Sequence, residues 1–254
     1  MKGADDMKNE REIREGFAQN GEQAAKDSKE SKDSKDTSGN GMMEVVFILD
    51  RSGSMGGREE DTIGGFNAML ERQKKESDNI IWSTVLFDDQ HDVIHNRVPV
   101  QKVKPLTGYD YYVRGCTALL DAVGRAIHHI SMCHRYSKPE DVPQKTLFVI
   151  TTDGYENASM EYSYEKVKKM IELEKELYGW EFMFLGANID AIDVAGRIGI
   201  DRSRVSNYVN DSIGIQKNYE AFGGAMASMA KMRDFDESSL DEVRKDFKKR
   251  GRRR

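Results

Sequence analysis

Two kinds of hydrophobic pattern alternate along residues 45–229. Short continuous apolar runs are typical of strands that are buried on both faces of a parallel sheet. Between these runs, apolar residues recur three and four positions apart, which is the spacing of an amphipathic helix. The runs predict strands at 45–49, 80–87, 93–98, 146–151, 182–186 and 204–207. The helical spacing predicts helices at 60–76, 117–134, 161–178 and 219–229.

The alternation of strands with helices predicts the fold class. A helix between two strands favours parallel pairing of those strands. We therefore expect an α/β fold with a doubly wound, mostly parallel sheet and helices on both faces. The strands at 80–87 and 93–98 are an exception, because a tight turn at Asp88, Asp89 and Gln90 joins them. This turn predicts one antiparallel edge strand.

The two ends of the chain lack this patterning. Residues 1–40 mix lysines with acids and serines, and such a segment buries too little apolar surface to offset chain entropy. We expect a disordered charged tail there, with a regulated or docking tail as the alternative, and a folded domain at 41–235. Residues 236–254 are expected to form a basic C-terminal tail. This tail would be solvated or in contact with an acidic protein or nucleic acid.

Composition narrows the class of protein. The net charge of −5 gives no case for a nucleic-acid-binding surface. Cys116 and Cys133 are the only two cysteines, too few for a disulfide framework, and we expect them to be the reduced thiols of a cytosolic protein. The first ten residues lack the apolar run of a signal peptide, and no stretch approaches the ~20 apolar residues of a membrane span. A cytoplasmic location without membrane contact is therefore expected.

A carboxylate and two hydroxyls follow the first predicted strand at alternate positions. Asp50, Ser52 and Ser54 come directly after the buried run, and Gly53 allows a tight turn between the two serines. Oxygen groups of this kind suit a hard divalent cation. The carboxyl ends of strands in open α/β sheets are also where ligands bind. Asp followed by Ser-Gly-Ser is common in turns as well, so the segment alone does not distinguish a turn from a metal site.

Two distant segments complete a known pattern. Thr117 follows a Gly-Cys turn and opens a predicted helix, and Asp153 closes a second buried strand. Asp-x-Ser-x-Ser, a distant Thr and a distant Asp together resemble the metal-ion-dependent adhesion site of von Willebrand factor type A domains. All five positions occur in the family's order, and the resemblance covers roughly residues 42–235. Cys116 departs from the Gly-Gly-Thr that is often seen in the family.

The resemblance implies a Rossmann-like fold and a set of roles. In the family, the two serines bind the metal directly, the threonine binds it directly or through water, and the two aspartates often act through water. This implies a site for Mg²⁺ or Mn²⁺ at Asp50, Ser52, Ser54, Thr117 and Asp153. A partner protein then supplies an Asp or Glu carboxylate to the metal. Bacterial stand-alone relatives often act as adaptors, some with ring-forming ATPases and some in metal-stress or tellurite-resistance systems, and this sequence does not select among those partners.

Other polar residues are expected to have structural roles. Asp88, Asp89 and Asp121 are expected to be turn, cap or supporting groups rather than direct ligands. A zinc site on the helix at 117–134 is not expected, because its candidate ligands scatter around the helix and no second ligand pair follows. Those candidates are His128, His129, Cys133 and His134.

The enzymatic alternative is a Mg²⁺-dependent phosphohydrolase of the haloacid-dehalogenase type. Such enzymes also place an Asp after a hydrophobic strand and end a later strand in Asp. Their first motif, however, needs a second acid two residues on as general acid/base, and Ser52 occupies that position. A serine does not titrate near neutral pH. The sequence therefore favours a binding module and not an enzyme.

Overall fold

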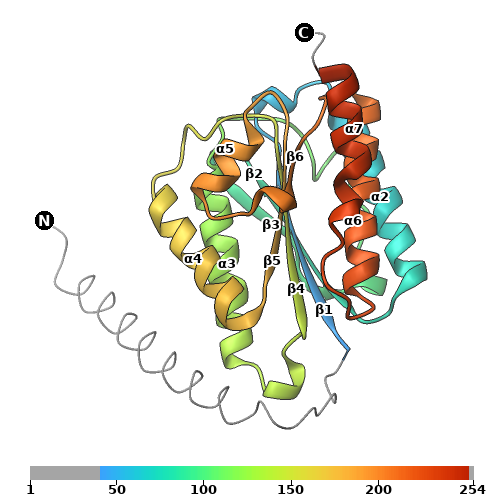
Figure 1. Ribbon diagram of the computed structural model, residues 1–254, viewed down its shortest axis with the longest axis vertical. Helices are drawn as coiled ribbons and strands as arrows, with labels where there is room; N and C mark the ends of the chain where they lie inside the picture. The colour runs from blue at the N-terminus through green and yellow to red at the C-terminus, as the bar shows by residue number, and fades with distance from the viewer. Residues whose placement is uncertain (1–40, 252–254) are drawn as a thin grey trace, which may run out of the picture. The chain divides into compact units, whose positions relative to one another are not determined.

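A six-stranded sheet organises residues 41–251, the part of the chain that the computed structural model describes (Figure 1). The strands are β1 (Met43–Asp50), β2 (Ile80–Phe87), β3 (His91–Pro99), β4 (Lys145–Thr152), β5 (Glu181–Gly186) and β6 (Val205–Asn207). Their order is β3-β2-β1-β4-β5-β6, and only the β2–β3 pair is antiparallel. The mostly parallel sheet with one antiparallel edge strand is therefore confirmed. The predicted disorder of residues 1–40 lies outside the described residues.

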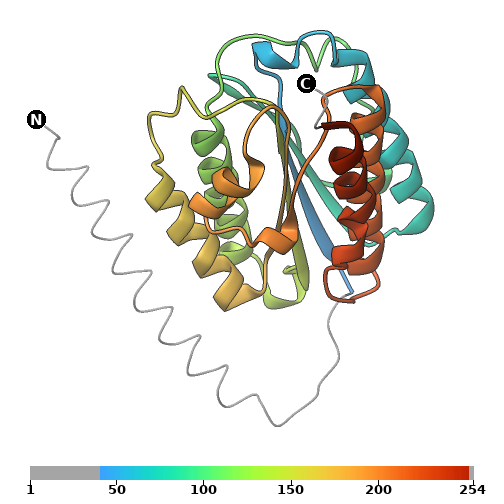
Figure 2. The same cartoon turned by 45° about the horizontal axis from the view of Figure 1, so that its top comes forward.

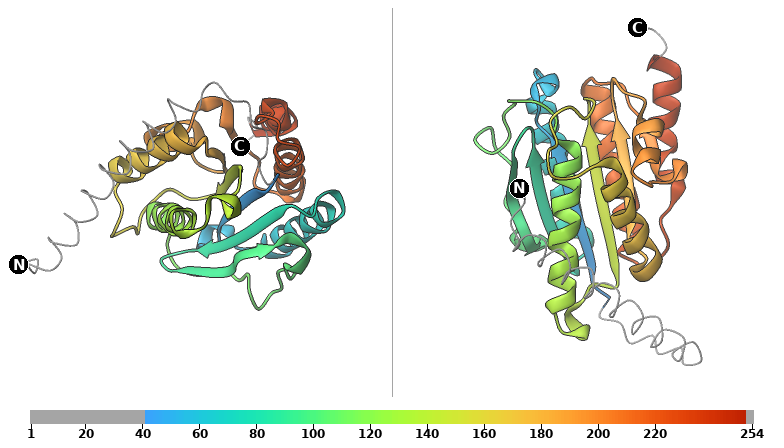
Figure 3. Two further views of the ribbon diagram at one scale, coloured as in Figure 1. Left: turned by 90° about the horizontal axis from the view of Figure 1, so that it is seen from below. Right: turned by 90° about the vertical axis from the view of Figure 1, so that its left-hand side faces the viewer.

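Helices cover both faces of the sheet. They are α2 (Glu59–Glu76), α3 (Leu119–Tyr136), α4 (Tyr164–Tyr178), α5 (Ala191–Arg197), α6 (Ser212–Met229) and α7 (Asp241–Arg250). Short 3₁₀ turns are η1 (Gly53–Met55), η2 (Val100–Lys102), η3 (Pro139–Asp141), η4 (Arg202–Arg204) and η5 (Glu237–Leu240). Figures 1 and 3 show α2, α6 and α7 on one face, and α3, α4 and α5 on the other. None of the helices within residues 41–251 has the length and apolar character needed to cross a membrane.

The side chains of β1 alternate between the two faces, as strand geometry requires. Val45 and Phe47 lie in the hydrophobic cluster beneath α2 and α6, whereas Val46 and Ile48 lie in the cluster beneath α3 and α4. All eight residues of β1 are buried. Burial on both faces is the reason why this strand appears in the sequence as a continuous apolar run.

Aromatic rings fix the packing on the α2 and α6 face. The Phe47 ring stacks on Trp82 of β2 with 4.7 Å between ring centroids. It also meets Phe66 of α2 and Phe222 of α6 edge-on, at 5.8 Å and 5.9 Å. Such pairs contribute about 0.5–1.5 kcal/mol beyond the burial of their area. The central strand is thereby joined to a neighbouring strand and to two helices.

The edge strand β3 pairs irregularly with β2. The register shifts between Trp82 and Thr84, and again between Thr84 and Val85. Arg97 adopts a positive φ of 51° and its backbone N–H bonds to the Ser83 hydroxyl at 3.0 Å, not to a strand carbonyl. These shifts bend the outer strand.

The C-terminal segment differs from the expected tail at 236–254. Residues 237–250 form η5 and α7, which pack against α6, and Leu240 and Val243 are 0% and 1% exposed. The apolar positions Leu240, Val243 and Phe247 do have helical spacing. They span little more than two turns among charged residues, so the pattern resembled a solvated tail. The folded domain therefore extends beyond residue 235 through α7.

Packing of this segment predicts a stability effect. Leu240→Ala should lower the free energy of unfolding by about 2–5 kcal/mol, because it leaves a cavity where a buried leucine stood. The matched control is Leu177→Ala on α4, where the leucine is 39% exposed and the change should stay within about 0.5 kcal/mol. Urea unfolding measures both values. A Leu240→Ala variant as stable as the control would show that η5 and α7 do not pack on α6 in solution.

Candidate metal centre

The five candidate residues lie at the carboxyl ends of β1 and β4. Asp50 is the last residue of β1, Asp153 follows the last residue of β4, and Ser54 lies in η1. Ser52 and Thr117 lie just before η1 and α3. Figure 2 brings this edge of the sheet towards the viewer. Here β1 and β4 are adjacent in the sheet although they are distant in the sequence, and ligands bind at such positions in open α/β sheets.

Hydrogen bonds connect four of the five residues in a chain. The Ser52 backbone N–H donates to Asp50 Oδ1 at 2.7 Å. The Ser52 and Ser54 hydroxyl oxygens are 3.1 Å apart, and the Ser54 hydroxyl donates to Asp153 Oδ1. The Asp-x-Ser-x-Ser segment and the distant aspartate therefore form one contact network.

Thr117 joins the group above Gly154. A Cβ atom added at Gly154 would lie 3.0 Å from Thr117 Oγ1 and 3.2 Å from Ser54 Oγ. Both hydroxyls thus converge over a backbone that carries no side chain. The structure brings all five sequence-predicted residues together, and only a glycine leaves the space between the two hydroxyls open.

The two carboxylates are buried without an ion-paired cation, although the charge of Arg58 acts against burial on the pKa of Asp153. Asp50 is 1% exposed, and burial raises its pKa from 3.8 to about 6 against the hydrogen bonds from Ser52 and Thr152, while the Asp153 charge adds to the rise. Burial also raises the pKa of Asp153. Within residues 41–251, neither carboxylate forms an ion pair with Lys, Arg or His. Burial of two such groups favours a bound cation that balances their charge.

The donor set fits a hard divalent cation. Two carboxylates and three hydroxyls offer oxygen atoms only, which Mg²⁺ and Mn²⁺ prefer. No three His, Cys, Asp or Glu side chains gather into a metal-binding group in the part of the chain that the structure describes. Any metal at this edge of the sheet would therefore depend on the hydroxyls of Ser52, Ser54 and Thr117.

Three supporting residues were missed by sequence reasoning. The Thr152 hydroxyl donates to Asp50 Oδ2, and Asn210 Nδ2 donates to Asp153 Oδ2 at 2.8 Å. Asn157 accepts from the Thr117 N–H at 2.9 Å and returns a bond from its own N–H to the Thr117 carbonyl at 3.0 Å. Thr152 could have been found from its position beside Asp153. The other two lie in loops, and no sequence signal points to them.

A buried charge network holds the loop that precedes Thr117. Arg51 is 1% exposed and donates from Nε to Asp88 Oδ2 at 3.0 Å, and Arg114 donates to the same oxygen. Burial alone would raise the pKa of Asp88, but the Gln90 N–H and the two guanidinium groups outweigh burial and lower it. Asp88 therefore acts as an ionised anchor of the loop, in line with the expected structural role.

Backbone contacts extend this anchoring to the candidate centre. The Arg114 N–H bonds to the Arg51 carbonyl at 2.9 Å, and the Ala118 N–H bonds to the Asp88 carbonyl at 2.8 Å. The Gly53 N–H bonds to the Gly115 carbonyl at 3.2 Å. The turn that carries the two serines and the loop that carries Thr117 are thus held against each other.

Asp121 also has the structural role that was expected. Its carboxylate accepts the N–H groups of Met160, Glu161 and Tyr162, each at 2.9 Å. These bonds fix the loop after Asp153 against the start of α3. Asp121 makes no contact with the five candidate residues among the hydrogen bonds of residues 41–251.

The raised pKa of Asp50 predicts how stability without metal depends on pH. The folded state keeps a proton on Asp50 up to about pH 6, whereas the unfolded chain releases it near 3.8. The proton therefore stabilises the fold fully below about pH 4, and this contribution, about 3 kcal/mol, is lost as the pH rises through 6. Asn cannot bind this proton. As the pH rises from about 4 to above 6 in EDTA, the free energy of unfolding should therefore fall less for Asp50→Asn than for the wild type. Urea unfolding measures both, and equal slopes would contradict the prediction.

Comparison with solved structures identifies the fold. The chain resembles the PilB minor pilin from Streptococcus sanguinis (15% identity, TM-score 0.54), covering 73% of this chain and 61% of that one. It resembles the pilus adhesin SpaC from Lactobacillus rhamnosus GG in its open conformation (10% identity, TM-score 0.54). That match covers 75% of this chain and 30% of SpaC. It also resembles the SpRpn10 VWA domain (9% identity, TM-score 0.50). That match covers 70% of this chain and 94% of the domain.

These similarities establish the fold but not the activity, because each sequence identity lies far below 25%. No protein-family model matches the sequence, and no curated protein sequence matches it. The chain also spans only about 61% of the length of PilB. The SpRpn10 VWA domain, in contrast, is matched over almost its whole length. Residues 41–251 therefore have a von Willebrand factor A-like, Rossmann-like α/β fold.

Proposed function

We propose that this chain is a metal-dependent protein-interaction module. Its Asp50, Ser52, Ser54, Thr117 and Asp153 would hold Mg²⁺ or Mn²⁺, and a partner protein would supply an Asp or Glu carboxylate. One observation carries the proposal: the Thr117 and Ser54 hydroxyls, from distant parts of the chain, converge over Gly154. A fold alone does not require this convergence.

The hydrogen bonds support the proposed orientation of the hydroxyls. The Ser54 hydroxyl donates its proton to Asp153, so it accepts from the Ser52 hydroxyl with one lone pair and can face a cation with the other. Asn210 and Thr152 hold the two carboxylates from behind. When bound, the cation would supply a positive charge that neutral hydroxyls quench only in part, and an outside carboxylate would complete its shell.

Exposed aromatic rings near the centre support protein recognition. Tyr112 is 44% exposed and lies 5.6 Å from the Arg51 guanidinium, and Tyr155, directly after Gly154, is 56% exposed. Tyrosines are enriched at protein interfaces because they combine a large apolar ring with a polar tip. The partner is proposed by its chemistry, an acidic side chain. A ring-forming ATPase or a component of a stress-resistance system remains a proposal of the same kind.

We propose binding over catalysis because Ser52 stands where a phosphohydrolase of the haloacid-dehalogenase type needs an acid. The Ser52 hydroxyl contacts Ser54, and its backbone N–H contacts Asp50. A serine in this position holds a neighbouring ligand and cannot exchange a proton near neutral pH. No specific observation favours the phosphohydrolase.

The first prediction concerns the metal. Calorimetry with Mg²⁺ and with Mn²⁺ should show one site in the wild type. Gly154→Ala should weaken binding at least tenfold, because its Cβ would occupy the space between Thr117 Oγ1 and Ser54 Oγ. Gly108→Ala is the matched control, since a Cβ there would meet no atom within 4 Å. Asp153→Ala should abolish binding. Normal metal binding by Gly154→Ala would contradict the proposed position of the metal.

The second prediction concerns the partner. A protein retained by the wild type in Mg²⁺ should be released by EDTA and identified by mass spectrometry. With that purified partner, Thr117→Ala should weaken binding as much as EDTA does, whereas Thr107→Ala, at an exposed threonine outside the centre, should bind normally. EDTA added to Thr117→Ala should cost little more, because coupled groups are not additive. A partner that binds Thr117→Ala normally would dock elsewhere.

A further inference from the structure

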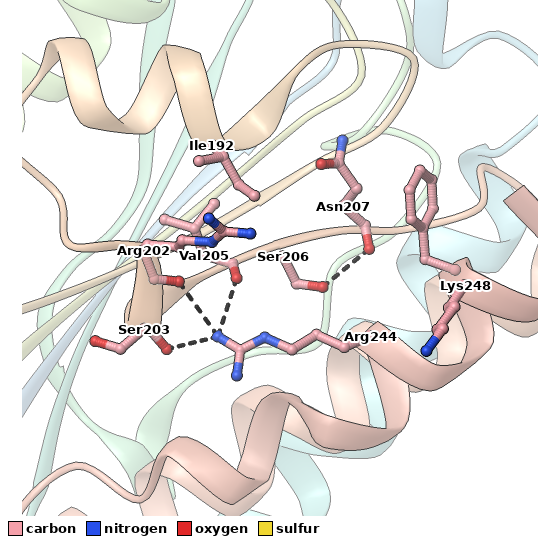
Figure 4. Close-up of a pocket in the computed structure, with 9 residues that line it drawn as sticks. Ile192, Arg202, Ser203, Val205, Ser206, Asn207, Arg244 and Lys248 are labelled. Carbon is pink, nitrogen blue, oxygen red and sulfur yellow. Dashed lines mark hydrogen bonds between the residues drawn. The ribbon is translucent and has the colours of Figure 1, made fainter.

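A groove of about 630 Å³ lies where α5, β6 and α7 meet at the edge of the sheet (Figure 4). It shares no residue with the candidate metal centre. Its volume falls within the ~300–1,000 Å³ of small-molecule sites. Two kinds of side chain face it, apolar ones from Ile192, Val205 and Phe247, and cationic ones from Arg202, Arg244 and Lys248.

The positive charge of the groove is not balanced. Arg202, Arg244 and Lys248 form no ion pair within residues 41–251. Two neighbouring acids already serve other cations. Asp201 pairs with Lys175 at 2.6 Å, and Glu181 pairs with Arg204 at 2.9 Å.

On α7, two of the three acids also serve other cations. Asp246 pairs with Arg250, and Glu242 pairs with Lys245 at 2.9 Å. The third, Asp241, forms no ion pair with Arg244 or Lys248 within the described residues. Arg244 and Lys248 lie four residues apart on this helix, where like charges repel and destabilise it. Figure 4 shows these two side chains on the α7 wall and Arg202 on the opposite wall. A bound anion would relieve the repulsion.

Arg244 is fixed in place before any ligand arrives. Its Nη2 donates to the carbonyls of Ser203, Val205 and Arg202 at 2.8, 3.2 and 3.3 Å (Figure 4). Nε and Nη1 make no hydrogen bond within the described part of the chain. These three bonds also occupy backbone acceptors at the start of β6 and just before it, so they oppose the addition of a peptide as a further strand. The groove therefore suits a small molecule better than an extended peptide.

We infer that this groove binds a phosphate ester that carries an apolar or flat body, the class to which nucleotides belong. A phosphate group carries about −1.5 to −2 charges near neutral pH, enough to engage several of the three cations, and guanidinium forks match its oxygen atoms. The ester's body lies against Ile192, Val205 and Phe247. A simple carboxylate would leave most of the positive charge unpaired.

The test uses ADP as the probe, with the full chain in EDTA so that no metal links nucleotide to the other centre. Calorimetry should show ADP binding that weakens as salt is added, weaker binding of inorganic phosphate, and no binding of adenosine. Arg202→Gln combined with Lys248→Gln should weaken ADP binding at least tenfold. Lys249→Gln, at the next and exposed residue of α7, is the charge-matched control for Lys248 and should bind ADP normally. Arg244 is kept because it holds backbone carbonyls.

Four results would overturn the inference. These are an absence of ADP binding at millimolar concentration, unchanged affinity in the double variant, loss of ADP binding in Asp153→Ala, and binding of an acidic peptide in place of ADP. The Asp153→Ala result is informative because that variant disables the candidate metal centre alone. Failure of the metal proposal therefore leaves this groove untouched, and the two proposals can fail separately.

Discussion

β1 and β4 run parallel with Leu49 opposite Thr151, and this register determines what the carboxyl edge of the sheet can do. It places Asp50 beside Thr152 and one residue from the level of Asp153. A shift by one residue would turn these side chains to the opposite faces of the sheet. Close packing of different side chains on the two faces opposes such a shift, since β1 and nearly all of β4 are buried. The hydrophobic core therefore positions the polar centre.

The candidate centre brings two carboxylates close together in the protein interior. Two carboxylates with raised pKa values face three hydroxyls. A few residues away, the buried residues Arg51 and Asp88 form a network of opposite charges with the partly exposed Arg114. A buried ion pair repays its desolvation only when its geometry is good and its remaining hydrogen bonds are satisfied. Here the residues of the network also form backbone hydrogen bonds. These bonds hold the loops that carry Ser52 and Thr117 in place.

Strong local patterns made much of the fold predictable. The apolar run of β1 and the helical spacing in α3 are each visible in a few residues, and the α/β class follows from their alternation. Thr117 and Asp153 were assigned to the site by the resemblance to the adhesion-site pattern, and strand ends and helix starts do meet at one edge of such a sheet. Their role as metal ligands stays a prediction.

The remainder depends on contacts that no local pattern encodes. Asn210 and Asn157 reach the centre from loops whose paths depend on tertiary packing. α5 is short, and α7 buries only a few apolar residues among many charges, so its helical pattern was too weak to separate it from a tail. Length and amphipathic contrast, more than position in the chain, decided what could be predicted.

The irregular pairing of β3 has a consequence for contacts between copies of the chain. An outer strand with regular backbone groups is a template on which the strand of another molecule can assemble. In β3 the two register shifts and the positive φ of Arg97 break the even spacing of those groups. The outer side of β3 therefore lacks the flat, repetitive geometry from which edge-to-edge aggregates grow. A local loss of pairing thus hinders extension of the sheet at its β3 edge.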